Sequence, residues 1–116
     1  MGKWRDVTDT FSERQRHYKN TYLEIDEVYD ETVEVSLFSS VEGPYELYIS
    51  YGKMYGIIYV DPGDAKAKRE EVKKELAAAY DKHKEPTGEF INEFSRKHQV
   101  QLPSDIFFDM SGLFGI

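Results

Sequence analysis

The chain has 116 residues, of which 40% are hydrophobic and 15% aromatic, and its formal net charge is -7. This length is typical of a single domain, and the apolar content predicts a folded core rather than a disordered chain. The absence of cysteine excludes disulfide scaffolds, thiolate metal sites and cysteine nucleophiles. The acidic balance argues against direct binding to nucleic acid, which needs cationic contacts to phosphate. Without a long apolar run or a signal-peptide pattern, we expect a cytoplasmic protein that does not bind membranes.

The N-terminal twenty residues give the weakest pattern. Apolar side chains recur there at roughly helical spacing, and Ser12 followed by Gln15 forms a capping box. We therefore predict an N-terminal helix over residues 12–20 and leave residues 3–11 unassigned.

An upstream β-hairpin is predicted by two runs of alternating apolar side chains, 22–26 and 32–37. A two-residue loop between them would place Glu27 opposite Glu34, which is unfavourable. We therefore predict an odd-length loop around residues 29–31. This register places Ile25 opposite Val35 and Leu23 opposite Leu37.

A second hairpin, from Tyr45 to Val60, gives the clearest pattern. Its two β-rich runs flank Gly52-Lys53, and a two-residue loop with glycine first suits a type II′ turn. In the resulting register one face receives seven apolar or aromatic side chains and one glycine, which supports the pairing. The opposite face receives Glu46, Tyr48, Ser50, Tyr55, Ile57 and Tyr59. The two hairpins together predict a four-stranded antiparallel meander.

Helical periodicity replaces the strand pattern after Asp61. An acidic N-cap followed by Pro62 is typical of a helix start, and Pro86 ends the helix at about residue 84. Its apolar stripe is formed by Ala65, Arg69, Val72, Leu76, Ala79, Tyr80 and His83. Thr87 caps a second predicted helix, over residues 87–98.

The predicted fold class is α+β. The antiparallel sheet has one apolar face that must be buried, and each amphipathic helix has an apolar side that must be buried. Both requirements are met when the helices pack on that face of the sheet. We predict a single domain over residues 1–116, with the apolar C-terminal segment 104–116 packed back on the core. The alternative is that this segment inserts into a groove on a partner.

No catalytic constellation, cofactor motif or metal-ligand spacing is found in the sequence. The three histidines, His17, His83 and His98, lack partners at ligand spacing, and the glycines of the second hairpin do not form a phosphate loop. We therefore expect no cofactor and no metal, and we favour a non-catalytic protein over an enzyme. His83 continues the apolar stripe of its helix, which indicates a packing or helix-end role.

The negative charge is concentrated in residues 21–61, which carry nine acidic side chains and one basic side chain. These acidic residues have two interpretations. They form either a solvated surface that protects a sheet edge from aggregation or a docking face for a basic partner. Tyrosines on the outer side of the second hairpin are either covered by a second layer or form a protein-binding patch. The candidate partner-binding residues are Glu24, Asp26, Glu27, Asp30, Glu31, Glu34, Tyr48, Tyr55 and Tyr59.

These features favour a non-catalytic protein–protein interaction module of the inhibitor, immunity or accessory-factor type found in bacteria and phages. We expect a protein partner, with a basic one favoured, and a homodimer as an alternative. A second hypothesis is a small-ligand or enzymatic domain with a pocket between sheet and helices, lined by the three tyrosines and His83. A third is a nucleic-acid mimic, in which carboxylates imitate phosphates.

Overall fold

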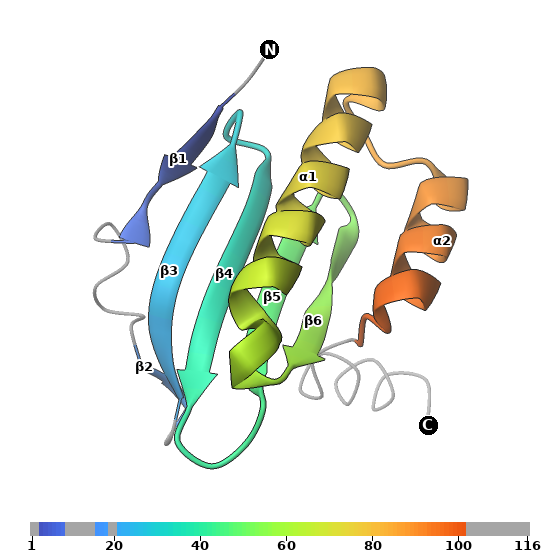
Figure 1. Ribbon diagram of the computed structural model, residues 1–116. Helices are drawn as coiled ribbons and strands as arrows, with labels where there is room; N and C mark the ends of the chain where they lie inside the picture. Colours follow the sequence, from blue (N-terminus) through green and yellow to red (C-terminus); the bar gives the residue numbers. More distant parts are fainter. Residues whose placement is uncertain (1–2, 9–15, 19–20, 102–116) are drawn as a thin grey trace, which may run out of the picture.

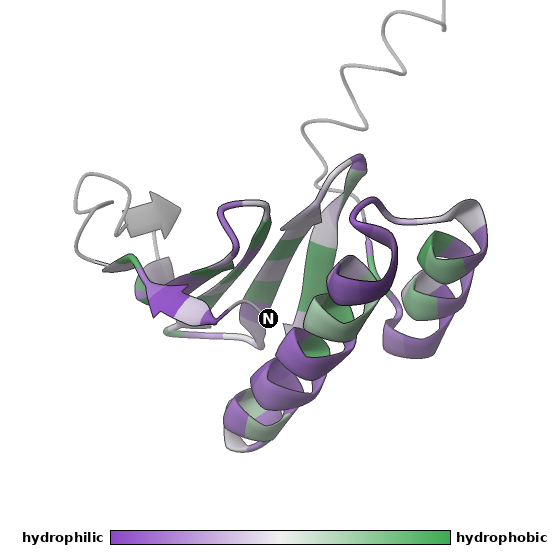
Figure 2. Ribbon diagram, turned by 90° about the horizontal axis from the view of Figure 1, so that it is seen from above, coloured by the Kyte–Doolittle hydropathy of each residue, from purple (hydrophilic) through white to green (hydrophobic). Residues whose placement is uncertain are grey.

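The computed structural model describes residues 3–8, 16–18 and 21–101. It shows an antiparallel sheet with two helices on the same side of it (Figures 1 and 2). The predicted α+β class is therefore confirmed. The predicted packing of segment 104–116 lies outside the described residues.

The described sheet has six strands: five lie in the order β1-β3-β4-β5-β6, and β2 pairs with β3 off this path. The four long strands are β3 (Thr21–Tyr29), β4 (Val33–Ser40), β5 (Tyr45–Tyr51) and β6 (Met54–Val60). They form the predicted meander. Two short strands, β1 (Trp4–Asp6) and β2 (Arg16–Tyr18), extend it along the free edge of β3.

The N-terminal helix prediction is wrong at residues 16–18, which form β2. The rest of the predicted helix lies outside the described residues. A capping box is a local preference, whereas the edge of β3 offers a row of backbone partners to any extended segment beside it. Pairing with that edge outweighs the local preference.

The β5–β6 hairpin has the predicted register, from Tyr51 opposite Met54 to Tyr45 opposite Val60. Gly52 has φ of +60°, as the first position of a type II′ turn requires. At Gly56 the chain after the second helix passes so closely that an added Cβ would lie 2.4 Å from a Val100 methyl carbon. A glycine is needed there for close backbone approach.

The β3–β4 hairpin has a loop of odd length, as predicted, but residues 30–32 form it rather than residues 29–31. Ile25 therefore pairs with Leu37 rather than with Val35. A register shift between Leu23 and Ile25 then places Leu23 opposite Phe38. The extra residue of a β-bulge accounts for this shift, because it breaks the strict alternation on which the prediction rested.

Two helices cover one face of the sheet, which we call the inner face. Helix α1 (Ala65–His83) follows the 3-10 turn η2 (Pro62–Asp64). Helix α2 (Gly88–His98) is capped by Thr87, whose hydroxyl accepts a hydrogen bond from the Phe90 amide at 3.0 Å. Neither of these described helices is long and apolar enough to cross a membrane.

The main core lies between α1, α2 and the inner face. Val72 and Leu76 of the predicted stripe are fully buried there, beside Leu47 and Ile49 of β5. His83 is exposed instead, and Lys73, which the stripe did not include, is buried. The apolar stripe of α1 therefore packs on the sheet only as far as Tyr80.

Candidate functional site

The structure distributes the six predicted acidic residues over several surfaces rather than one. Glu27 lies on the inner face under α1, and Asp30 and Glu31 form the β3–β4 turn. Asp26 and Glu34 point to the opposite side of the sheet, which we call the outer face. Glu24 lies at the register shift of β3 and accepts a hydrogen bond from Ser39 at 2.6 Å.

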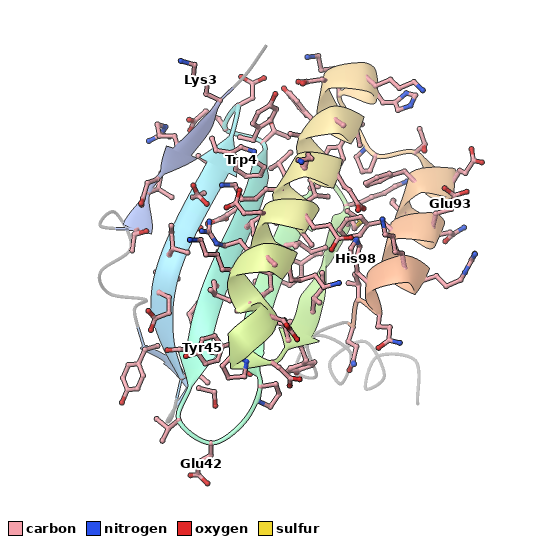
Figure 3. The ribbon with its side chains drawn as sticks, viewed as in Figure 1. Lys3, Trp4, Glu42, Tyr45, Glu93 and His98 are labelled. Carbon is pink, nitrogen blue, oxygen red and sulfur yellow. The ribbon has the colours of Figure 1, made fainter. Side chains whose placement is uncertain are left out.

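Glu27 is used inside the fold. Its carboxylate binds the guanidinium of Arg69 and, at 2.9 Å, the ammonium of Lys73. All three side chains are nearly buried, with exposed fractions of 11–13%. The Lys73 ammonium also lies 5.2 Å from the centroid of the Trp4 ring, on the side of β1 that faces α1 (Figure 3). This cluster, which we call the Glu27 node, ties α1 to β3 and β1.

Several other carboxylates accept hydrogen bonds from hydroxyl groups. Ser36 donates to Asp26 at 2.9 Å, and Tyr80 donates to Asp30 at 2.6 Å. Three further pairs have the same chemistry: Thr8 with Asp6, Ser39 with Glu24, and Tyr29 with Asp81.

A hydroxyl donor fixes the position of a carboxylate but leaves its charge in place. The hydrogen bonds from Thr8 lower the pKa of Asp6, and the bond to Asp30 raises the pKa of the Tyr80 hydroxyl. Both effects keep the proton on the hydroxyl and the negative charge on the acid. Within the predicted block, Glu27 and Glu31 form ion pairs with bases, Glu31 with Arg5.

The outer face is an ordered grid of twelve side chains from β3 to β6, in three cross-strand rows. Neighbours within a row lie about 5 Å apart, as in any antiparallel pair. None of the twelve is Lys or Arg. The rows are Val28–Glu34–Ser50–Tyr55, Asp26–Ser36–Tyr48–Ile57 and Leu23–Phe38–Glu46–Tyr59.

The three predicted tyrosines all belong to this grid but differ in exposure. Tyr48 is 7% exposed and packs edge-on against Phe38, with ring centroids 5.1 Å apart. Tyr55 and Tyr59, on the edge strand β6, are 39% and 45% exposed. Tyr48 is therefore part of a second, smaller core, whereas the β6 tyrosines present large ring surfaces to solvent.

Glu46 is the residue of this face that the sequence prediction missed. It lies between Phe38 and Tyr59 in its row, and its Oε1 atom is buried without a hydrogen-bond partner in the described part of the chain. Burial raises the pKa of Glu46, and a hydrogen bond from the Tyr48 hydroxyl opposes this shift. Its place beside two tyrosines on the predicted outer face was the available signal.

A small cavity of about 60 Å³ opens on the outer face. Because the Ser36 hydroxyl donates its proton to Asp26, only the lone pairs of its oxygen remain to face the cavity. The Glu34 carboxylate adds further acceptor atoms. The lining residues are Glu34, Ser36, Phe38, Tyr48, Ile49, Ser50 and Tyr55.

A larger and more open hollow of about 510 Å³ lies where β6 runs into α1. Asp61, Asp64 and Glu71 line it, together with the exposed ring of Tyr59. Lys68 is the one base among the described residues of its wall, and its ammonium lies 3.2 Å from His98 Nδ1 and 3.8 Å from Glu71. The hollow therefore has an acidic wall, and its size is that of a small-molecule site.

A polar cluster joins α1 to α2. The buried ring of His98 (Figure 3) donates through Nε2 to Glu75 at 3.0 Å, because its Nδ1 atom accepts from the Lys68 ammonium. Burial alone would raise the pKa of Glu75, but hydrogen bonds from Lys97 and His98 bring it below its usual value.

The same cluster brings three metal-ligand atoms of Glu71, Glu75 and His98 within 4.8 Å of one another. However, the Lys97 ammonium lies 2.7 Å from Glu75 and 3.7 Å from Glu71. A lysine therefore occupies the place that a cation would take, and we interpret the cluster as an ion-pair network that fixes α2 to α1.

Comparison with protein-family models, with curated proteins and with solved structures finds no match to this chain.

Proposed function

We propose that this protein is a non-catalytic protein-binding module whose sheet docks a basic segment of a partner protein. The observation that carries the proposal is the outer-face grid, none of whose twelve side chains is Lys or Arg, and in which Glu34 and Glu46 share cross-strand rows with the exposed rings of Tyr55 and Tyr59. Charge of one sign on a surface steers an oppositely charged partner and sets its orientation.

The docking surface that we propose is the accessible part of the outer face, around Glu34, Glu46, Tyr55 and Tyr59. It combines two carboxylates with two exposed tyrosine rings. Tyrosine contributes large contact area at small entropic cost, and a ring face also attracts cations. A partner segment with Arg or Lys beside apolar side chains would complement both features.

Selection from a library of random displayed peptides tests this proposal, with the full chain as bait. We expect enrichment of Arg and Lys among the selected peptides at about 0.05 M salt, and weaker binding at about 0.5 M salt, where charges are screened within a few ångströms. Selected peptides should lose affinity for Glu34→Gln/Glu46→Gln.

The matched control is Glu89→Gln/Glu93→Gln, which removes the same charge from exposed positions of α2. This variant should bind the selected peptides as the wild type does. A library that yields no binders, or binders without basic residues, would refute the proposal, as would equal binding to both double variants.

The 510 Å³ hollow favours a second candidate function, the binding of a small cationic molecule between Asp61, Asp64 and Glu71. A thermal-shift screen with diamines and polyamines tests it. Stabilisation that disappears in Asp61→Asn/Asp64→Asn would support this function, and no stabilisation by any amine would exclude it.

A further inference from the structure

We infer that a groove between α1 and α2 binds a small carboxylate with an apolar body. The carboxylate would lie at Lys82 and His83, and the apolar body would lie on the alanines of α1 and the ring of Phe90. This site is separate from the outer face of the sheet and goes beyond the proposed docking function.

A hollow of about 340 Å³ lies between the two helices, which run beside each other (Figure 1). Its volume is within the range of small-molecule sites. Positions 75, 78, 79, 82 and 83 of α1 share one stripe of that helix, which extends about 12 Å at 1.5 Å per residue. We call this hollow the interhelix groove, and its described lining residues are Glu75, Ala78, Ala79, Lys82, His83 and Phe90.

The floor of the interhelix groove is apolar. Ala78 and Ala79 belong to a run of three alanines, whose methyl side chains leave room between the helices. The ring of Phe90 is half-buried and is held by Phe94 and Tyr51, at centroid distances of 5.4 Å and 6.2 Å. An aromatic or aliphatic body placed on this floor would remove apolar surface from water, which favours binding.

The one carboxylate among the described lining residues is compensated. Glu75 lies 2.7 Å from the Lys97 ammonium and 3.0 Å from His98 Nε2. Lys82 and His83, by contrast, are exposed and form no ion pair within the described part of the chain. The end of the groove at Lys82 is therefore the end that attracts an anion.

The two bases of this end lie in the last turn of α1, where positive charge is favoured by the helix dipole. Their N–H groups remain available to a ligand. The lysine ammonium has three donors, and an imidazole keeps at least one N–H in either protonation state. A carboxylate would accept charge-assisted hydrogen bonds from Lys82.

A single negative charge fits this site better than several. Lys82 brings one positive charge, and the chain as a whole has a net charge of -7, which repels polyanions such as nucleotides. The sequence predicted a ligand pocket lined by His83 and three tyrosines. In the structure His83 lies in the interhelix groove, whereas the three tyrosines belong to the outer face.

The test uses the 15N-labelled full chain and three probes that share one phenylpropyl body: hydrocinnamate, its neutral amide, and phenylpropylamine. We expect saturable amide shifts centred on Ala78, Ala79 and Phe90 for hydrocinnamate, with a Kd of about 1–10 mM for a ligand of this size. The neutral amide should bind roughly fivefold more weakly, as the loss of a charged hydrogen bond implies, and the amine more weakly still.

Lys82→Gln should weaken hydrocinnamate roughly fivefold and leave the affinity of the neutral amide unchanged. His83→Ala should weaken hydrocinnamate roughly threefold, because one N–H donor is lost. The matched control is Lys66→Gln, which removes the same charge from an exposed position near the start of α1 and should change neither affinity.

Ala78→Leu tests the apolar floor. Leucine is nearly as good a helix former as alanine, and position 78 is exposed, so the fold should be retained while the larger side chain fills the groove. Saturable shifts should disappear for all three probes. Circular dichroism of each variant checks that the fold is retained.

The inference is overturned if no probe gives saturable shifts, or if the shifts are centred away from α1 and α2. Equal binding of hydrocinnamate and its amide would also overturn it, as would unchanged affinity in Lys82→Gln or binding that survives Ala78→Leu. The peptide selection described above tests residues of the outer face, so either proposal can fail while the other stands.

Discussion

Replacement of Glu27 by glutamine should destabilise the protein by more than any other single charge removal on the sheet. The Glu27→Gln substitution keeps the shape of the side chain but leaves Arg69 and Lys73 nearly buried with most of their negative counter-charge gone. Breaking a buried ion pair by removing one partner typically costs about 3–5 kcal/mol.

Glu70 moderates this cost. Its Oε2 atom lies 3.4 Å from Arg69 and 3.5 Å from Lys73, but the side chain is 55% exposed, so it compensates only in part. We therefore expect a loss of about 2–3 kcal/mol, or a decrease in Tm of about 8–12 °C for a domain of this size.

Urea unfolding followed by two probes measures this loss. Circular dichroism reports the whole fold, and fluorescence of Trp4, the single tryptophan, reports the node because the Lys73 ammonium lies over its ring. Coincident transitions would show that unfolding is two-state. Glu70→Gln is the control and should cost about 0.5 kcal/mol or less.

The double variant Glu27→Gln/Lys73→Met separates loss of charge pairing from loss of packing. Removal of one uncompensated cation should restore more than half of the lost stability, because the buried charge imbalance is then smaller. If Glu27→Gln costs no more than Glu70→Gln, the electrostatic account of the node is refuted.

Three further predictions concern single side chains. Gly56→Ala should cost about 1–3 kcal/mol in urea unfolding, because its Cβ would overlap a methyl group of Val100; an unchanged midpoint would contradict the close packing. Tyr51→Phe should raise the unfolding free energy by about 1 kcal/mol, since the Tyr51 hydroxyl is buried without a hydrogen-bond partner in the described part of the chain; a loss would show that the hydroxyl has a partner. Burial raises the pKa of Glu46, so its charged form destabilises the fold as pH rises through that pKa. Glu46→Gln should therefore be more stable than the wild type at pH 7 and equal to it in acid, and a stability difference independent of pH would refute this.

The elements that sequence predicted best are those with local signals. The turn at Gly52 and the alternation on both sides of it determine every pair of the β5–β6 hairpin. Thr87 and Pro86 likewise predict where α2 begins. In each case a few adjacent residues are enough to determine the local structure.

The features that the sequence did not predict depend on residues distant in the chain. The register shift of β3 has no turn or glycine to signal it, and β2 forms because β3 offers it an edge. The position of Arg69 on the apolar stripe of α1 indicated that an acid lies opposite it on the sheet, because a base that faces a core needs a buried acidic partner. Nothing in the local pattern around Glu27 identified it as that acid.

The meander order also determines when each part of the fold can be completed during synthesis. Every strand from β3 to β6 pairs with the strand made just before it, so the sheet can form while the chain is still growing. The apolar inner face is then complete before α1 exists. At translation rates of about 5–20 residues per second, the 19 residues of α1 take about 1–4 s to synthesise. During that interval α1 does not yet cover Val33, Val35 and Ile49, and apolar surface that is exposed in this way during folding is prone to aggregation.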